Sequence, residues 1–427
     1  MYLAPLMRFM ASTVEKRLTE IPRPTDAPSA HSSGLDPDRI LVIGSGLASG
    51  WGVRTNDLAL PGHLARELTR LTSRGTDVDL ITDHRMTVAD GLSAIARVDL
   101  QRYDAVVVTL GVTDAMQRTR RSDWEQHMDE LLNEIATRSS FTTHALVTGI
   151  QPIRSIPVYN TWWGQVADRR AHQFNHITEA LVGAHVRMSY VDLPGERIPN
   201  RRHTDPVMYQ RWAKLLATHL AAQLDAAVVS APQATANSAR GHRSRPQAEG
   251  PRQRAVEDMQ LVGGTPTPNL QRIVNLAREM FGTQAAAVSV IDGDRQWLYA
   301  KSGIDLDHVP RSQSFCAATI SSSSELVVSD ANVDPKFRHF DAVARKDIGF
   351  YAGHPIESPD GYRIGALCIL DPLPRRFSQD DRSALRDLAL RVQQELWVGW
   401  AGPSKEAVVV ERPTRRKRRA AAPVSAA

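Results

Sequence analysis

Short apolar runs alternate with helical patterns over the first half of the chain. The runs of strand length are continuously apolar, and they lie at residues 40–43, 78–81, 105–110, 145–148 and 188–191. Between two of them, Leu64, Leu68 and Leu71 recur at the spacing of one helix face. Continuous apolar strands that alternate with amphipathic helices predict a parallel sheet with helices on both faces. We therefore expect a three-layer α/β/α domain over residues 39–225, with its ligand crevice beyond the carboxyl ends of the strands.

A different pattern begins near residue 258. An amphipathic helix comes first, with Leu270, Val274 and Ala277 on its apolar face. Strand-like runs follow it at residues 286–291, 296–301, 326–331, 350–356 and 364–370. Asp292-Gly293 between the first two runs predicts a hairpin, and Ser378 with Asp381 three residues later predicts the start of a final helix. Residues 258–398 are thus predicted to form an α+β domain with an antiparallel sheet.

Three segments lack the periodicity of a folded core. Residues 1–38 are rich in Pro, Ser and Ala and are predicted to be disordered. Residues 226–257 are small, polar and proline-bearing, which predicts a flexible linker that leaves the relative orientation of the two domains free. Residues 399–427 are expected to form a basic, disordered tail.

The excess of positive over negative charge in the chain comes from that tail. The 427-residue chain has a formal net charge of +5, and residues 412–419 hold six basic side chains. Without this run the remainder carries about −1. A basic run of this kind either contacts nucleic acid or an anionic surface, or only keeps the chain in solution. The sequence leaves both interpretations open.

The remaining composition narrows the setting of the protein. No run approaches the ~18 consecutive apolar residues of a membrane span. The N-terminus lacks a basic stretch ahead of a long apolar one, which argues against a secretory signal. The only cysteines, Cys316 and Cys368, lack the spacing of metal ligands. We therefore expect a cytoplasmic protein, and the sequence predicts no metal or other cofactor.

Motifs of the N-terminal domain resemble the sequence blocks of the SGNH/GDSL hydrolases. Gly44-Ser45-Gly46-Leu47, followed by Gly50-Trp51-Gly52, is similar to their first block, Gly-Asp-Ser-Leu. Gly111-Val112-Thr113-Asp114 is similar to the Gly-x-Asn-Asp block, and Asn200-Arg201-Arg202-His203 to the Asp-x-x-His block. The resemblance covers about residues 39–224 and implies an SGNH-hydrolase-like fold.

Most catalytic residues of that family are nevertheless replaced. The position of the nucleophilic serine is Gly46, and the position of the oxyanion asparagine is Thr113. The residue that would orient the histidine is Asn200, which cannot stabilise an imidazolium as a carboxylate does. His203 matches the family. The resemblance therefore implies a pseudoenzyme whose pocket, around Gly46, Gly111 and Thr113, retains the architecture without the ordinary chemistry.

An atypical esterase is the alternative that these residues leave open. Ser45 or Ser49 would then replace the missing nucleophile, with His203 as the base and Asp114 as its carboxylate partner. A one-residue shift at a strand end redirects a side chain, so Ser45 need not face His203. The simpler interpretation gives His203 and Asp114 ordinary capping or hydrogen-bonding roles.

The C-terminal domain resembles a GAF domain over nearly its whole length. The order of its elements matches, including a short helix at residues 314–320. The resemblance implies a small-ligand sensor or a dimerisation module, whose pocket lies between the sheet and residues 315–347. Phe315, Cys316 and Tyr351 are its expected lining residues, and the ligand stays unnamed. Cys316 would anchor a chromophore, sense redox state, or serve as a small buried apolar residue.

We therefore expect a two-domain protein that acts in small-ligand sensing or regulation, with a catalytically degenerate N-terminal domain. The alternatives are a GAF-regulated esterase and a scaffold that docks through its basic tail. The final helix, residues 378–397, carries more apolar residues than one narrow core stripe needs, among them Leu385, Leu388 and Leu390. Part of this helix is thus expected to pair with a second copy in a homodimer.

Overall fold

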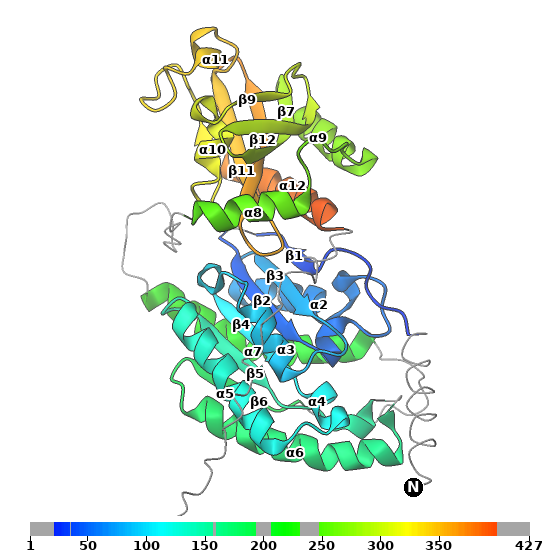
Figure 1. The fold of residues 1–427 in the computed structure, drawn as a ribbon. Helices are drawn as coiled ribbons and strands as arrows, with labels where there is room; N and C mark the ends of the chain where they lie inside the picture. The colour runs from blue at the N-terminus through cyan, green and yellow to red at the C-terminus, as the bar shows by residue number, and fades with distance from the viewer. Residues whose placement is uncertain (1–20, 35, 157–158, 194–205, 231–246, 399–427) are drawn as a thin grey trace, which may run out of the picture.

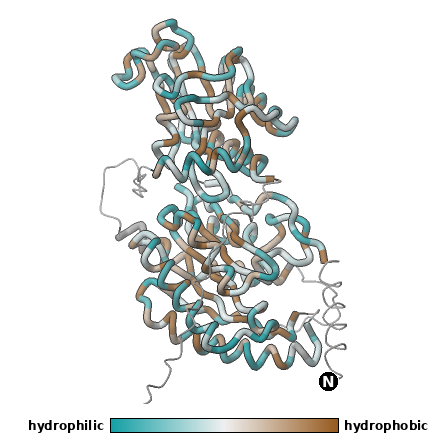
Figure 2. Tube along the Cα trace, in the orientation of Figure 1, coloured by the Kyte–Doolittle hydropathy of each residue, from teal (hydrophilic) through white to brown (hydrophobic). Residues whose placement is uncertain are grey.

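The computed structural model describes residues 21–34, 36–156, 159–193, 206–230 and 247–398. It shows two domains stacked end to end (Figure 1). Hydrophobic segments lie within both domains, while hydrophilic segments run along much of the outer loops (Figure 2). The expected basic tail and the motif that contains His203 lie outside the described residues. Within the described ranges, every helix is too short or too polar to cross a bilayer.

A six-stranded sheet forms the centre of the N-terminal domain, with the strand order β1-β3-β2-β4-β5-β6. The strands are β1 (Ser29–Ser32), β2 (Asp38–Gly44), β3 (Thr76–Thr82), β4 (Ala105–Thr109), β5 (His144–Thr148) and β6 (Met188–Val191). β2 to β6 run parallel, and β1 pairs antiparallel with β3 at the edge. The five expected strands coincide with β2 to β6, so this domain has the parallel α/β architecture that the apolar pattern predicts.

Helices cover both faces of this sheet. Ile40 and Val42 pack in a core with α2 (Leu60–Thr72) and α7 (Pro206–Ser230). Leu41 and Ile43 pack in a second core, on the side of α3 (Val88–Ile95), α4 (Val112–Gln117), α5 (Arg121–Arg138) and α6 (Trp162–Gly183). Successive side chains of a strand point to opposite faces, so a strand that is apolar throughout needs a layer of helices on each side.

The C-terminal domain contains a second six-stranded sheet, with the order β10-β11-β12-β7-β8-β9. Its strands are β7 (Ala285–Asp292), β8 (Arg295–Ser302), β9 (His308–Pro310), β10 (Leu326–Val328), β11 (Phe350–Glu357) and β12 (Arg363–Asp371). All neighbouring strands are antiparallel. β7 and β8 form the predicted hairpin, whose turn holds Gly293 at a φ of +54°.

Two groups of helices cover this second sheet. α8 (Glu249–Met259), α9 (Pro268–Met280) and α12 (Gln379–Trp397) share a core with one face. α10 (Phe315–Thr319) and α11 (Asp341–Ala344) lie on the other face. α12 begins with the predicted capping box, in which Ser378 and Asp381 each accept a hydrogen bond from the other's backbone N–H. The prediction of an α+β domain with an antiparallel sheet is confirmed.

The structure differs from the expected boundaries at two places. Residues 29–32, expected to be disordered, form β1, and Ala30 within it is buried. Four residues are too few to give a periodic pattern. The expected linker is also shorter, because α7 continues to Ser230 and α8 begins at Glu249. Ala255 and Val256 of α8 are buried against the sheet, although the composition of this segment is polar.

A buried carboxylate of the C-terminal domain joins the two domains. Glu357, at the end of β11, forms ion pairs with Arg39 of β2 and with Arg102, and its side chain is only 6% exposed. Arg39 Nη1 lies 3.1 Å from Glu357 Oε1, and Arg102 also pairs with Asp79 at 3.0 Å. Gly361, in the next turn, approaches Arg102 so closely that a Cβ there would collide with the guanidinium. Burial alone would raise the pKa of Glu357, but Arg102 and Arg39 lower it to about 2.

A second ion-pair cluster lies at the same interface. His31 of β1 bridges two carboxylates: its Nδ1 is 2.7 Å from Asp77 and its Nε2 is 3.0 Å from Asp387 of α12. Arg386 of α12 pairs with Asp77 in turn, and Ser33 donates a hydrogen bond to Asp387. Burial lowers the pKa of His31, but the hydrogen bonds to Asp387 and Asp77 outweigh it and raise the pKa to about 9. His31 therefore links the domains as a cation at neutral pH.

These ion pairs fix the C-terminal domain against the amino edge of the parallel sheet. Arg39 and Asp77 are each the second residue of their strand. The expectation that the linker leaves the domain orientation free is therefore wrong. Three of these pairs, His31–Asp387, Arg39–Glu357 and Asp77–Arg386, join residues more than 300 positions apart in the chain. Contacts of this kind leave no local pattern in a sequence.

The final helix uses its surface differently from the expectation. Leu385 and Leu388 are buried in the core of their own domain, and Leu390 is half-buried. Arg386 and Asp387 face the N-terminal domain, as the ion pairs above show. Part of the helix thus pairs with the other domain of the same chain, and the homodimer stays a prediction.

We predict that Glu357→Ala destabilises the protein by about 3–5 kcal/mol, because it leaves Arg39 and Arg102 buried without their carboxylate. Urea unfolding followed by circular dichroism measures the change. The control is Glu134→Ala on α5, where the partner Arg138 is half-buried and keeps its hydrogen bonds to the carbonyls of Ile95 and Val98, so the expected loss is below about 0.5 kcal/mol. Equal effects of the two substitutions would contradict the role of Glu357.

We also predict a specific dependence of stability on alkaline pH. Because the folded pKa of His31 is raised, its contribution is complete below its ordinary pKa of about 6.5 and is lost as the pH rises through about 9. Between pH 7 and pH 9.5 the wild type should lose on the order of 1–3 kcal/mol more than His31→Asn. The charged groups that surround His31 (Asp77, Asp387 and Arg386) are present in both the wild type and His31→Asn, so their own titration affects the two proteins alike. Parallel stability curves for the two proteins would refute the prediction.

Candidate functional site

The carboxyl edge of the parallel sheet carries the predicted catalytic residues. β2 has β3 on one side and β4 on the other, so the topological switch point lies between β2 and β4. Ser45 follows β2, and its N–H donates to the carbonyl of Thr109 at 2.9 Å. A Cβ built on Gly46 would lie 3.6 Å from Val112, beyond the end of β4. The structure thus brings the first and the Gly-Val-Thr-Asp motifs together.

The two candidate serines have different surroundings. Ser45 is 2% exposed, and its hydroxyl has no hydrogen-bond partner within the described part of the chain. Ser49, in the short helix η1 (Gly46–Ser49), donates its hydroxyl proton to the carbonyl of Gly46 at 2.7 Å. Gly46 itself has a φ of +60°, a conformation that favours glycine. The hydroxyl of Ser49 is therefore occupied within its own turn, whereas that of Ser45 is not.

Asp114 caps a helix in this structure. Its two carboxylate oxygens accept hydrogen bonds from the N–H of Val88, the first residue of α3, at 3.3 and 3.2 Å. Thr119 donates a further hydrogen bond at 3.3 Å. Asp114 is fully buried, and burial raises its pKa to about 6. Of the roles that the sequence left open, the capping role is the one that these contacts show.

The two remaining pocket residues of the crevice also have structural roles. Thr113 donates its hydroxyl proton to the carbonyl of His84 at 3.5 Å. Gly111 has a φ of +113°, and a Cβ there would collide with Ile150 and Trp124. The crevice thus collects the candidate residues at one edge, but their contacts are those of packing and capping. His203, which would complete the site, lies outside the described residues.

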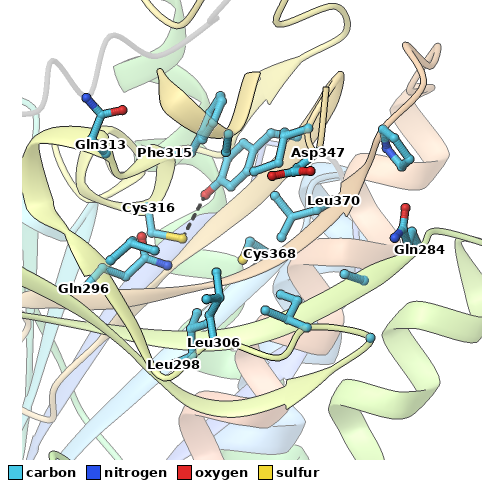
Figure 3. A pocket seen from close by; sticks show the side chains of 18 of the residues that line it. Gln284, Gln296, Leu298, Leu306, Gln313, Phe315, Cys316, Asp347, Cys368 and Leu370 are labelled. Atoms are coloured by element: carbon cyan, nitrogen blue, oxygen red, sulfur yellow. Dashed lines mark hydrogen bonds between the residues drawn. The ribbon is translucent and has the colours of Figure 1, made fainter. Parts of the chain in front are cut away.

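A large cavity lies in the C-terminal domain, between the sheet and the segment from α10 to α11. Its volume is about 520 Å³, and Figure 3 shows it from close by. Its apolar lining includes Leu298, Ile304, Leu306, Phe315, Tyr351 and Leu370. Phe315, Cys316 and Tyr351, the three residues expected to line a pocket here, all lie on it. A cavity of this size and lining suits a small organic ligand.

Stacked aromatic rings form one wall of the cavity. The ring of Phe315 stacks on that of Tyr351, with centroids 4.9 Å apart and planes 21° apart. Phe337 stacks on Phe315 at 4.6 Å. Ser314 positions this wall, because its hydroxyl accepts a hydrogen bond from Ala317 N and donates one to Gln296. The wall is therefore fixed before any ligand arrives.

The charged groups of the cavity lie near solvent. Arg345 and Asp347 pair with each other at 2.9 Å, and their side chains are 62% and 56% exposed. Gln296, in contrast, is buried and presents an uncharged amide. The interior of the cavity is thus polar at few points and carries its charges at the rim.

Both cysteines of the chain line this cavity. They are free thiols and fully buried. Tyr351 donates its hydroxyl proton to the sulfur of Cys316 at 3.4 Å. A hydrogen bond with Cys368 lowers the pKa of Cys316 and outweighs the effect of burial, whereas the pKa of Cys368 is raised. Figure 3 shows the two sulfur atoms pointing toward one another.

Two residues on or beside the cavity were not expected from the sequence to belong to this site. Cys368 lies in an apolar strand, where a cysteine looks like any small core residue. Gly353 lies two residues after Tyr351 on β11, and a Cβ at this position would collide with the Tyr351 hydroxyl. A glycine inside a strand indicates a close approach of another group, and this was the available signal. In the ranges that the structure describes, no three His, Cys, Asp or Glu side chains are placed to hold a metal ion.

Comparison with known proteins identifies this domain. Residues 266–396 match the family model of the GAF domain. The C-terminal domain is a GAF domain. A cyclic di-GMP phosphodiesterase of Pseudomonas aeruginosa is 36% identical over 131 residues, which make up 30% of this chain and 22% of that relative. The chain therefore spans only about a fifth of the length of the relative that it matches.

Two solved structures that are similar to the chain each cover about a third of it. One is the free methionine-R-sulfoxide reductase of Neisseria meningitidis, which is 20% identical with a TM-score of 0.27 and covers 35% of this chain and 86% of its own. Another is the GAF domain of an Acinetobacter phosphoenolpyruvate-protein phosphotransferase, which is 14% identical with a TM-score of 0.27. The match covers 34% of this chain and 92% of that structure's chain. The hydrolase resemblance of the N-terminal domain stays a prediction.

We predict that Gly353→Ala destabilises the protein by about 1–3 kcal/mol, because the new methyl group must displace the buried Tyr351 hydroxyl. Thermal unfolding measures the change. Gly183→Ala at the end of α6 is the control, since a Cβ there meets open space. If both variants unfold like the wild type, the close contact between residue 353 and Tyr351 does not affect the stability of the protein, and the prediction is wrong.

Proposed function

We propose that this protein is a small-ligand sensor whose GAF cavity binds an uncharged, partly planar organic molecule and whose N-terminal domain is a hydrolase-like partner without ordinary esterase activity. The observation that carries the proposal is the cavity of about 520 Å³ with its stacked Phe315–Tyr351 wall. Aromatic faces favour a flat apolar ligand, and the buried Gln296 amide offers it a hydrogen bond. The paired charges of Arg345 and Asp347 at the rim favour neither sign of ligand charge.

The position of the cavity supports a regulatory role. Tyr351 and Glu357 lie on the same strand, β11, the first at the cavity and the second at the domain interface. A ligand that shifts β11 would alter the ion pairs that Glu357 makes with Arg39 and Arg102. The free energy of ligand binding would then be coupled to the free energy of contact between the domains, as an allosteric link requires. The similarity to a phosphodiesterase of a cyclic dinucleotide supports a place in signalling.

The contacts at the crevice support the loss of esterase activity. The nucleophile position is Gly46, Ser49 donates its proton within its own turn, and Asp114 caps α3. A serine hydrolase needs a nucleophile hydrogen-bonded to a base and donors for the oxyanion. The atypical esterase therefore rests on Ser45 with His203, and it remains the second candidate because the buried hydroxyl of Ser45 has no hydrogen-bond partner among the residues that the structure describes.

Ligand binding can be tested by thermal shift with a library of small metabolites under reducing conditions. We predict that at least one neutral aromatic compound raises the melting temperature of the wild type, and that Leu298→Trp, which fills the cavity, abolishes the shift. Leu276→Trp on the exposed side of α9 is the matched control and should retain it. A shift that survives Leu298→Trp would place the ligand elsewhere and contradict the proposal.

A further prediction concerns the N-terminal domain. The full-length protein should hydrolyse aryl esters no faster than His203→Ala, because the usual nucleophile position is Gly46. Steady-state hydrolysis of a short-chain p-nitrophenyl ester measures this. A rate that His203→Ala lowers by ~10³-fold, and that Ser45→Ala lowers equally, would instead establish the atypical esterase.

A further inference from the structure

We propose that Cys316 and Cys368 are a redox site, and that a peroxide entering the GAF cavity converts them into a reversible intramolecular disulfide. The inference deepens the proposed function, since it requires, as that function does, a cavity that small molecules enter. It concerns the reaction of the cavity with an oxidant and does not require that an organic ligand be found.

The two thiols have the placement that such a reaction needs. Cys316 lies on α10 and Cys368 on β12, and these two elements pack against each other. Both side chains line the same cavity, and their sulfur atoms point toward one another (Figure 3). A disulfide needs an S–S separation of about 2.05 Å, so the thiols must still move together. The element that must move, α10, is a single turn of five residues.

The surroundings of the two thiols favour Cys316 as the one that reacts first. Its sulfur accepts the hydroxyl proton of Tyr351 at 3.4 Å, and a donor of this kind stabilises a thiolate. The hydroxyl of Tyr351 also lies 2.6 Å from that of Thr319, whose own proton is donated to the carbonyl of Phe315 at 3.1 Å. The described contacts give Cys368 no equivalent hydroxyl donor. Cys368 is therefore placed to act second, as the resolving thiol.

The chemistry balances with hydrogen peroxide as the oxidant. The Cys316 thiolate attacks one peroxide oxygen, so an S–O bond forms, the O–O bond breaks and the second oxygen leaves as water after protonation. Cys368 then attacks the sulfur of the sulfenic acid, so the S–S bond forms and the S–O bond breaks with loss of a second water. The two sulfurs lose two electrons in total, and the two peroxide oxygens gain them.

The disulfide would change the sensor because Phe315 precedes Cys316 directly. Drawing Cys316 toward β12 moves the start of α10, and with it the ring that stacks on Tyr351. It also removes the Cys316 thiol whose sulfur accepts the hydrogen bond from the Tyr351 hydroxyl. Oxidation is thus expected to reshape the wall on which a planar ligand would bind.

The test uses the full-length protein, reduced and then exposed to hydrogen peroxide. Because the chain has only two cysteines, the outcome can be counted: free thiols should fall from two to zero per chain. Intact mass should fall by about 2 Da, as two hydrogens are lost. Digestion should yield one linked pair of peptides that contains Cys316 and Cys368, the chain should stay monomeric on a non-reducing gel, and dithiothreitol should restore both thiols. Links between chains, sulfinic acid without a link, or thiols that stay unreacted while a model peptide is oxidised would each overturn the proposal.

Two single substitutions test the order of the steps. In Cys368→Ser, peroxide should leave a sulfenic acid on Cys316 that dimedone traps. In Cys316→Ser, oxidation of Cys368 should be at least about tenfold slower, because Cys368 lacks the Tyr351 hydrogen bond. Equal rates in the two variants would contradict the assignment of Cys316, and the peptide mapping of the wild type does not depend on either variant.

The failure of this inference can be told apart from failure of the proposed function. The metabolite screen is run with reductant present, so it reports ligand binding by the dithiol form. The peroxide experiment is run without ligand, so it reports the disulfide. If a metabolite binds but no disulfide forms, the redox site is wrong and the sensor function stands. If the disulfide forms but no metabolite binds, the redox site stands and the sensor function is wrong.

Discussion

A carboxylate buried between two domains must be balanced by cations of the other domain, and Glu357 meets this requirement in the present fold. Arg39 and Arg102 both form ion pairs with it, and Arg102 forms a second ion pair with Asp79. Such clusters add little to stability over an apolar interface, but they penalise every arrangement in which one charge is left alone. The docking in this structure pairs all of these groups. The ion pairs therefore specify the orientation of the domains.

That orientation decides what each domain can do. The GAF domain occupies the amino edge of the parallel sheet, where Arg39 and Asp77 lie. The crevice with Ser45 and Gly46 lies at the opposite edge, so docking does not cover it. The GAF cavity lies on the sheet face opposite to α12, the helix that carries Arg386 and Asp387. Both candidate sites lie away from the domain interface, and β11 connects the cavity with that interface.

The sequence predicts the parts of this structure that depend on local patterns. Continuous apolar runs located β2 to β6, the Asp-Gly pair located the β7–β8 turn, and Ser378 with Asp381 located the start of α12. Each of these signals arises within a few neighbouring residues. The interface could not be predicted in this way, because His31 and Asp387 are 356 positions apart. β1 and α8 were missed for a related reason: each is stabilised by the sheet that it joins more than by its own pattern.

Some residues of the candidate sites could likewise be predicted from the sequence, and others could not. Phe315, Cys316 and Tyr351 could be placed on one cavity because the order of elements resembled a known fold. Cys368 and Gly353 could not, since their roles depend on which atoms lie opposite them in space. Asp114 is the instructive case, because a carboxylate after a strand suits a catalytic and a capping role equally. Only the hydrogen bonds from Val88 and Thr119 distinguish the two.

Cutting the chain tests whether buried ion pairs hold the two domains together without help from the linker. A recognition sequence for a specific protease inserted between residues 236 and 240 allows cleavage between the domains. Size-exclusion chromatography with light scattering then measures the mass of the product. The halves of the wild type should elute together near the 47.2 kDa of the whole chain, and the halves of the cleaved Arg102→Met variant should separate. Wild-type halves that separate at micromolar concentration would show that the ion pairs do not hold the domains together.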